Sequence, residues 1–281
     1  MRDDRHIMRY GLLSDVHANL PALTAAVRRL SELGVDRWLC AGDVIDYGPQ
    51  PNECVAELAA LDPVCIVGNH ELAALGELPD DRYSPRARAS LAWTRTVLTD
   101  DSRRWLAALP PLAEVPGVVM AHGSLTDPEE YVRREDQAEA QLDLLAAEHP
   151  GARVLVLGHT HRAWLYRQGR DSVSGTIPDA VPARAAGQAT EVTLAHESRY
   201  LVNPGSVGQS RQRERRPLAR CALLEVPESG PAAITVRFLA VPYDHRAVRA
   251  ALRRERLPLD SVHVRPGALA RLRRTLARHQ P

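Results

Sequence analysis

The sequence has 281 residues, 44% of them hydrophobic, which is enough to fill the core of one large α/β domain. Its formal net charge of +1 does not favour binding to nucleic acid or to a membrane surface through bulk electrostatics. All 36 basic residues are arginines, so chemistry that needs a lysine, such as a Schiff base or a P-loop, is excluded.

Apolar runs alternate with helix-like segments up to residue 157, which is typical of βα units. The pattern predicts strands at 10–14, 38–41, 64–67, 118–121 and 153–157, and helices at 20–33, 52–61, 84–98, 102–109 and 137–149. Each of these strands is followed closely by Asp, Asn or His side chains, and no comparable junction occurs between residues 72 and 113. These strand ends are therefore the candidate site.

The pattern changes in the second part of the chain. Short β-like pieces lie between residues 164 and 202, and we expect antiparallel strands of a second sheet at 221–226 and 234–241. We interpret residues 168–197 as an irregular insertion. Residues 244–281, with Arg-rich helices at 245–255 and 267–279, are expected to form a C-terminal helical appendage on a single domain that spans residues 1–281.

Two of the junctions carry a pair of candidate ligands separated by one residue, Asp15-x-His17 and His159-x-His161. In an extended segment, residues at this spacing point to the same side, so each pair can bind one centre. A mixture of oxygen and imidazole ligands suits Mn, Fe, Zn or Co better than Ca or Mg. The candidate metal ligands are Asp15, His17, Asp43, Asn69, His122, His159 and His161.

These seven candidate ligands exceed the number that a single ion takes from a protein while it keeps a coordination position open. Two ions that share Asp43 as a bridge are the simpler interpretation, and their charge attracts anions without any lysine. Ions about 3.5–4 Å apart lower the pKa of a bridging water, and the resulting hydroxide can attack phosphorus in line. The set of ligands therefore predicts hydrolysis of phosphate esters.

The chain resembles the calcineurin-like metallophosphoesterase family over residues 9–208, through the ordered motifs Asp15-x-His17, Gly42-Asp43, Gly68-Asn69-His70-Glu71, His122 and Gly158-His159-x-His161. The resemblance implies a four-layer αββα sandwich, in which two mixed β-sheets are flanked by helices. It implies that one ion is held by Asp15, His17, Asp43 and His161, and the other by Asp43, Asn69, His122 and His159. Manganese is the first expectation for the two divalent ions, with Fe, Zn, Co or Ni as alternatives. Residues 203–208, Asn-Pro-Gly-Ser-Val-Gly, further resemble the small bacterial phosphodiesterase branch.

The resemblance also implies a catalytic role for His70, which would protonate the leaving oxygen and contribute about 10²–10⁴ in rate. Asp46 stands where the phosphoprotein phosphatase branch holds this histidine with an aspartate. The alternatives are a supporting position beside the metal for His70, and an exposed turn or helix cap for Asp46. Tyr47 stands where that branch has a phosphate-binding arginine. Because a bidentate arginine suits a phosphate dianion, its absence favours phosphodiesters.

The candidate substrate-binding residues are Asn69, His70, Gly205 and Ser206. Gly205 and Ser206 would offer backbone donors to the pocket, although a plain Asn-Pro-Gly turn explains them almost as well. The basic run 211–216 is expected to be a solvated surface segment, and an approach to substrate phosphates is the alternative.

We therefore expect a metal-dependent phosphoric ester hydrolase that acts on a small phosphorylated substrate, with phosphodiesters favoured. The alternatives are a phosphomonoesterase or dinucleoside polyphosphate hydrolase and, from another class, a non-catalytic metal-binding scaffold. Nucleic acid is not required as a partner, no membrane partner is expected, and the oligomeric state stays open. Four cysteines without CxxC spacing, and the lack of a secretory or membrane-spanning apolar run, predict a cytoplasmic protein.

Overall fold

The computed structural model of the protein describes residues 7–169, 175–176, 187, 189–195, 197–212, 214, 216–227, 233–259 and 261. Two six-stranded sheets form the centre of the molecule. The first sheet has the order β3 (Val64–Cys65), β2 (Arg37–Cys40), β1 (Ile7–Leu13), β11 (Leu218–Pro227), β12 (Ile234–Pro242) and β9 (Ala189–Leu194). The second has the order β4 (Leu112–Val115), β5 (Val118–Ala121), β6 (Val154–Leu157), β10 (Arg199–Asn203), β7 (Trp164–Gln168) and β8 (Gly175–Thr176).

Both sheets mix parallel and antiparallel pairs. In the first sheet β1 pairs in parallel with β2 and antiparallel with β11. In the second sheet β5 and β10 both pair in parallel with β6, whereas β4 pairs antiparallel with β5. The expectation of two mixed sheets is therefore confirmed.

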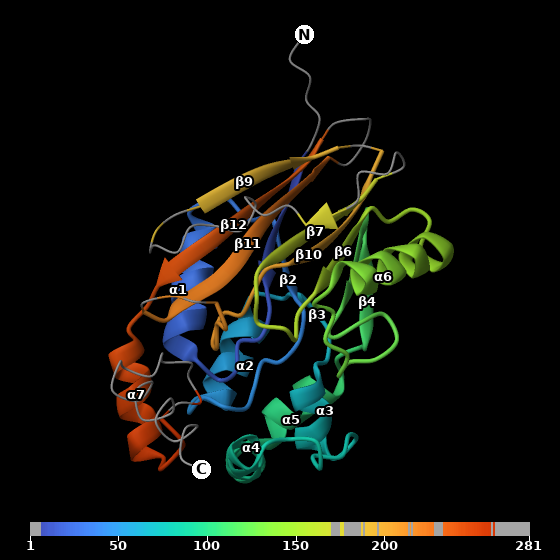
Figure 1. The fold of residues 1–281 in the computed structure, drawn as a ribbon. Helices are drawn as coiled ribbons and strands as arrows, with labels where there is room; N and C mark the ends of the chain where they lie inside the picture. The colour runs from blue at the N-terminus through green and yellow to red at the C-terminus, as the bar shows by residue number, and fades with distance from the viewer. Residues whose placement is uncertain are drawn as a thin grey trace, which may run out of the picture.

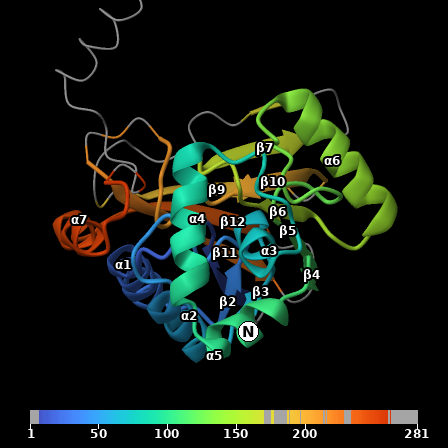
Figure 2. The same cartoon turned by 90° about the horizontal axis from the view of Figure 1, so that it is seen from below.

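Helices cover the outer faces of the two sheets (Figure 1). Helix α1 packs on β11 and β12, and α6 packs on β7 and β10 on the opposite side of the molecule, which Figure 2 shows from below. The helices are α1 (Leu20–Ser31), α2 (Pro51–Ala60), α3 (Asn69–Leu75), α4 (Pro85–Val97), α5 (Asp100–Ala107), α6 (Glu135–Glu148) and α7 (His245–Arg254). The arrangement is the expected αββα sandwich.

Strand alternation explains how the layers are held together. Leu12 of β1 points into the apolar cluster between the sheets, and Leu13 belongs to the cluster under α1 and α2. In the second sheet Val154 and Val156 of β6 face the first sheet, while Leu155 and Leu157 pack under α6. Because successive side chains of a strand point to opposite faces, each buried strand contributes to two apolar interfaces at once.

The structure differs from the sequence prediction in three places. Helix α3 and strand β4 were not predicted, since both are short. The helix begins inside the motif at 68–71 and the strand follows two prolines, and both patterns are typical of loops. Within the expected irregular insertion at 168–197, residues 189–194 form the regular edge strand β9, which pairs with β12. Its alternating exposed and partly buried residues have few large apolar side chains, so the strand signal was weak.

Helix α7 agrees with the prediction for 245–255, and the side chain of Asp244 caps it by accepting from two backbone N–H groups. The second appendage helix, predicted at 267–279, lies outside the described residues, as does much of the 168–197 segment. Among the described residues, no helix combines the length and the apolar character needed to cross a membrane.

Candidate metal centre

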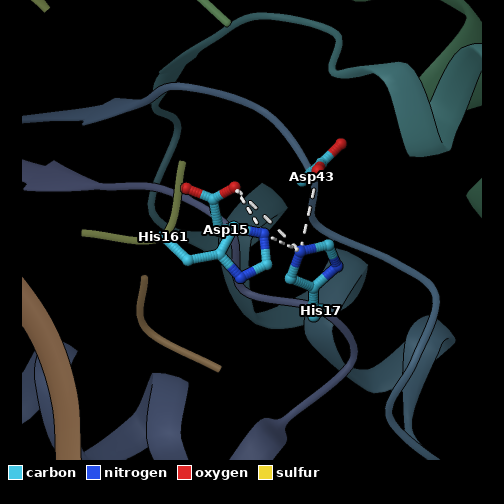
Figure 3. Close-up of side chains that lie close together, drawn as sticks. All are labelled: Asp15, His17, Asp43 and His161. Carbon is cyan, nitrogen blue, oxygen red and sulfur yellow. Dashed lines mark hydrogen bonds and ion pairs between the residues drawn. The ribbon is translucent and has the colours of Figure 1, made fainter. Parts of the chain in front are cut away.

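The polar side chains that follow five strands meet at one end of the two sheets. In each of two groups, ligand-capable atoms lie within 4.8 Å of one another. The first group is Asp15, His17, Asp43 and His161, shown in Figure 3, and the second is Asp43, His122 and His159. Every member of both groups is buried. The structure thus brings these candidate ligands together, with Asp43 common to both groups.

Asn69, the remaining candidate ligand, is the first residue of α3. Its Oδ1 lies 3.1 Å from Nε2 of His122, beside the second group. Its Nδ2 donates to the hydroxyl of Tyr83 at 2.6 Å, and this hydrogen bond turns the amide oxygen towards the centre. Tyr83 was not a candidate, because it lies in the 72–113 segment that carries no motif at a strand end.

The two carboxylate oxygens of Asp43 differ in their contacts. Its Oδ1 accepts the backbone N–H of His70 at 3.0 Å, whereas its buried Oδ2 has no hydrogen bond among the described residues. This Oδ2 lies 3.2 Å from Nε2 of His122 and 3.6 Å from Nε2 of His17. Burial favours the neutral acid, but the rings of His122 and His70 hold the pKa of Asp43 well below its usual range. A buried, ionised oxygen that has no hydrogen bond among the described residues and lies between imidazoles of both ligand groups fits a position that bridges two cations.

Backbone carbonyls hold the imidazole rings from behind. His17, His122 and His161 each direct Nδ1 at a carbonyl oxygen, which leaves Nε2 free to face the centre as a ligand. The carbonyls belong to Ile45 at 3.1 Å, Ala41 at 2.6 Å and Gln209 at 2.8 Å, respectively. His159 is held the other way, because its Nε2 bonds the carbonyl of Glu129 at 3.1 Å and Nδ1 remains free.

The backbone has a positive φ at five of the seven candidate ligands. The φ angles are 52° at Asp15, 47° at His17, 54° at Asp43, 61° at His159 and 58° at His161. The two ligand pairs are therefore not extended, and the expectation that spacing in an extended segment aligns them was wrong. Positive φ values in residues other than glycine cost energy and persist only where surrounding contacts enforce them. Here hydrogen bonds between the loops do so, such as that from His17 N to Asp43 O at 2.9 Å.

Glu71 organises the loop that carries Asp43, a role that was not predicted from the sequence. Its buried carboxylate accepts from the backbone N–H groups of Asp43 at 2.8 Å, Val44 at 2.8 Å, Ile45 at 3.1 Å and Gly68 at 2.9 Å. Burial and the nearby charge of Asp43 raise the pKa of Glu71 to about 7, although these donors oppose the shift. The available signal was its place three residues after the helix-capping Gly68, where an acidic side chain reaches back to free N–H groups.

His70 and Asp46 form a buried pair beside the two ligand groups. Nδ1 of His70 lies 2.6 Å from Oδ2 of Asp46, and the hydroxyl of Ser90 on α4 donates to the other carboxylate oxygen. Asp46 is fully buried, which excludes the exposed turn that was its alternative. Burial disfavours the imidazolium, but the carboxylates of Asp43 and Asp46 raise the pKa of His70. The structure therefore places a ring of raised pKa next to the centre.

Gly205 and Ser206, two of the candidate substrate-binding residues, lie behind the Asp15 loop. The fully buried hydroxyl of Ser206 donates to the carbonyl of Asp15 at 2.8 Å. Gly205 has a φ of 82°, and a Cβ there would meet Arg220 at 2.8 Å. Neither residue lines the cavity beside the centre. They support the loop from behind, which agrees better with the turn that was the alternative, and the expected contact with substrate stays a prediction.

A cavity of about 310 Å³ opens beside the centre. Asn69, His70 and His159 form its inner wall. The other lining residues are Tyr47, Arg82, Tyr83, Ser84, Ala87, Glu129 and Tyr131. A small ester could therefore reach both the ligand groups and the His70 ring from this space.

Arg211 lies closer to the centre than expected for the 211–216 surface run. It is half-buried, and its backbone N–H bonds the carbonyl of His161 at 3.1 Å. Burial and then the Arg211 guanidinium hold the pKa of His161 well below its usual range, which keeps that ring neutral and able to bind a metal.

Comparison with known proteins places the chain in a family. A model of the calcineurin-like phosphoesterase superfamily domain matches residues 8–229, and the protein belongs to this family of phosphoester hydrolases. An uncharacterised protein of Methanocaldococcus jannaschii is 29% identical over 208 residues, which cover 71% of this chain and 76% of that protein.

Two crystal structures have the same fold. A metallophosphoesterase from Sphaerobacter thermophilus is 29% identical, with a TM-score of 0.71 over 92% of this chain and 97% of that one. A hypothetical protein from Pyrococcus horikoshii is 18% identical, with a TM-score of 0.65 over 91% of this chain and 96% of that one. The family and the His/Asp cluster together make this chain a metallophosphoesterase whose substrate and metals are treated below.

Replacing Glu71 by Gln tests its role in holding the Asp43 loop. The amide has one acceptor oxygen, so backbone N–H groups that now bond a carboxylate oxygen would be left buried without a partner. At roughly 1–3 kcal/mol for each such group, we expect the free energy of unfolding in urea to fall by about 2–5 kcal/mol. Glu77→Gln, an exposed change just after α3, is the control and should alter stability by less than about 0.5 kcal/mol. Equal free energies of unfolding in the two variants would contradict the role of Glu71 in holding the Asp43 loop.

Metal binding should release protons. Burial opposes a charge on His122, but Asp43 raises the pKa of this ring to about 10 in the metal-free site, so a metal must displace its proton at neutral pH. Apparent affinity for Mn²⁺ is expected to increase with pH. Calorimetric titrations at pH 7 in two buffers of different protonation enthalpy measure the release, and identical heats in both buffers would rule it out.

Proposed function

We propose that the protein is a dimetal phosphodiesterase. One divalent ion is held by Asp15, His17, Asp43 and His161, and the other by Asp43, Asn69, His122 and His159. The observation that carries the proposal is the buried Oδ2 of Asp43, which has no hydrogen bond among the described residues and faces both ligand groups. Manganese is the metal we expect, because mixed imidazole and oxygen donors without thiolate suit it, as they also suit Fe, Zn, Co or Ni.

When bound, two divalent ions supply a nucleophile from water at neutral pH and neutralise charge on the phosphoryl oxygens. The protein supplies the proton for the leaving group. Nδ1 of His70 is held by Asp46, so its Nε2 is the nitrogen left to donate, and the ring lines the cavity where the ester would lie. Asp46 stabilises the charged ring and fixes its direction, and Ser90 holds Asp46.

The charges around the cavity support a diester rather than a monoester. Among the described residues that line it, the permanent cation is Arg82, and its guanidinium already bonds Glu129 at 3.2 Å. Tyr47 contributes a neutral side chain. A phosphomonoester carries nearly two negative charges and benefits more than a monoanionic diester from a free arginine on the wall. A phosphomonoesterase or dinucleoside polyphosphate hydrolase remains the alternative that substrate comparison tests.

A non-catalytic scaffold explains the structure less well. Metal binding alone does not need the buried pair of His70 with Asp46, or the serine that supports it. All four cysteines are free and buried, which fits a reducing compartment, so we also propose a cytoplasmic location.

The function is tested with metal-stripped protein that is reloaded with Mn²⁺. We expect it to hydrolyse bis(4-nitrophenyl) phosphate with a higher kcat/KM than 4-nitrophenyl phosphate. Asp43→Asn should lower the rate about a hundredfold or more, because the bridging charge is lost. Asp81→Asn, an exposed change, is the control. Full activity in Asp43→Asn would overturn the mechanism, and a preference for the monoester would favour the alternative.

The role of His70 is tested by varying the leaving group. His70→Gln should reduce kcat about 10²–10⁴-fold for an alkyl phosphodiester, whose leaving oxygen needs a proton. The loss should be much smaller for a 4-nitrophenyl diester, because nitrophenolate leaves without one. His149→Gln, a change in a histidine that bonds Glu114 away from the centre, provides the matched control. An equal loss for both esters would assign His70 a structural role.

A further inference from the structure

Tyr47 occupies the space between a ligand group and the proposed acid. Its ring centroid lies 4.7 Å from that of His17 and 4.7 Å from that of His70. The same side chain lines the cavity, together with His70 and Asn69. A phosphoryl group that contacts both His70 and the ligand group of His17 would therefore lie close to the Tyr47 ring.

The backbone fixes the direction of this side chain. Tyr47 has a φ of 60° and follows Asp46, whose φ is 67°. The N–H of Tyr47 bonds the carboxylate of Asp46 at 2.6 Å and the hydroxyl of Ser90 at 2.8 Å. Two successive left-handed residues other than glycine cost conformational energy. The hydrogen bonds of the Tyr47 N–H stabilise this conformation. The position of the ring is thereby set before any substrate binds.

The hydroxyl of Tyr47 has no protein partner in the described part of the chain, and it is not among the fully buried atoms. Its neighbour in the cavity wall is different, because the Tyr83 hydroxyl accepts from Asn69 Nδ2 at 2.6 Å and donates to the Asn69 carbonyl at 3.1 Å. Tyrosine hydroxyls in such enclosed positions usually find a hydrogen-bond partner. The free hydroxyl of Tyr47 is therefore available to a ligand in the cavity.

We propose that the Tyr47 hydroxyl donates a hydrogen bond to a non-bridging phosphoryl oxygen, and that this neutral donor sets the preference for monoanionic diesters over dianionic monoesters. The inference rests on the proposed phosphoesterase function and adds to it a specificity-determining residue. The phenol is uncharged and keeps its proton in the neutral range, so it can donate a hydrogen bond there. It offers one hydrogen bond and no charge. It can therefore stabilise a monoanionic diester, but it gives a dianionic monoester no additional stabilisation for its second charge.

Two variants test the proposal. Tyr47→Phe keeps the ring and removes the donor, and we expect kcat/KM for bis(4-nitrophenyl) phosphate to fall about ten- to a hundredfold, as for loss of a hydrogen bond to a charged group. Tyr47→Arg adds a cation, and we expect the ratio of monoester to diester kcat/KM to rise at least about tenfold. Phenylphosphonate is a dianion that the enzyme cannot hydrolyse. In Tyr47→Arg, its affinity measured by calorimetry should increase more than the affinity for diethyl phosphate.

Tyr166→Phe is the matched control, since it removes a hydroxyl that bonds Glu139 far from the centre, and its kinetics should equal those of the unmodified enzyme. Thermal unfolding of each variant shows whether it is folded. If the unmodified enzyme cleaves neither ester, the proposed function fails. If it cleaves the diester, the inference alone is overturned by either of two results: wild-type kinetics in folded Tyr47→Phe, or an unchanged ester ratio and phosphonate affinity in folded Tyr47→Arg.

Discussion

The carboxylate of Glu71 is the contact on which the rest of the centre depends. It accepts from N–H groups in the loop after β2 and from Gly68 after β3, and so ties two neighbouring strand ends to one buried charge. A buried carboxylate is costly by itself, but several charge-assisted hydrogen bonds offset that cost. The loop that presents Asp43 is consequently rigid before a metal arrives.

The same rigidity explains why the site tolerates strain and close approach. Asp43 holds a left-handed backbone conformation, and Gly68 passes so near that an added Cβ would lie 2.2 Å from its Oδ1. The imidazoles of His17, His122 and His161 are held by carbonyls from behind, so each of these rings has one nitrogen engaged and directs the other to the centre. Preorganised ligands lose little entropy when they bind an ion, and their spacing, not their flexibility, then determines which ions fit.

The sequence predicted well which side chains meet at the centre, because each candidate ligand follows an apolar strand and carries a chemically distinctive side chain. The layered fold was equally accessible, through strand alternation and a resemblance that is now confirmed. Supporting residues were not predictable in the same way. Ser90 lies on helix α4, whose sequence is typical of an ordinary surface helix. Nothing in that sequence distinguishes Ser90, because its contact with Asp46 arises from tertiary packing. The spacing of Asp15 and His17 suggested the right neighbours for the wrong reason, because periodicity does not reveal left-handed backbone.

The centre also joins the two sheets. Asp15, His17 and Asp43 come from the first sheet, whereas His122, His159 and His161 follow strands of the second. Contacts cross between them: Nε2 of His17 lies 3.1 Å from Nε2 of His161, and the N–H of His159 bonds Oδ1 of Asp15 at 3.0 Å. The ligand spacing is therefore set by the apolar interface between the sheets, and ions that bind only the folded arrangement would stabilise that interface in return.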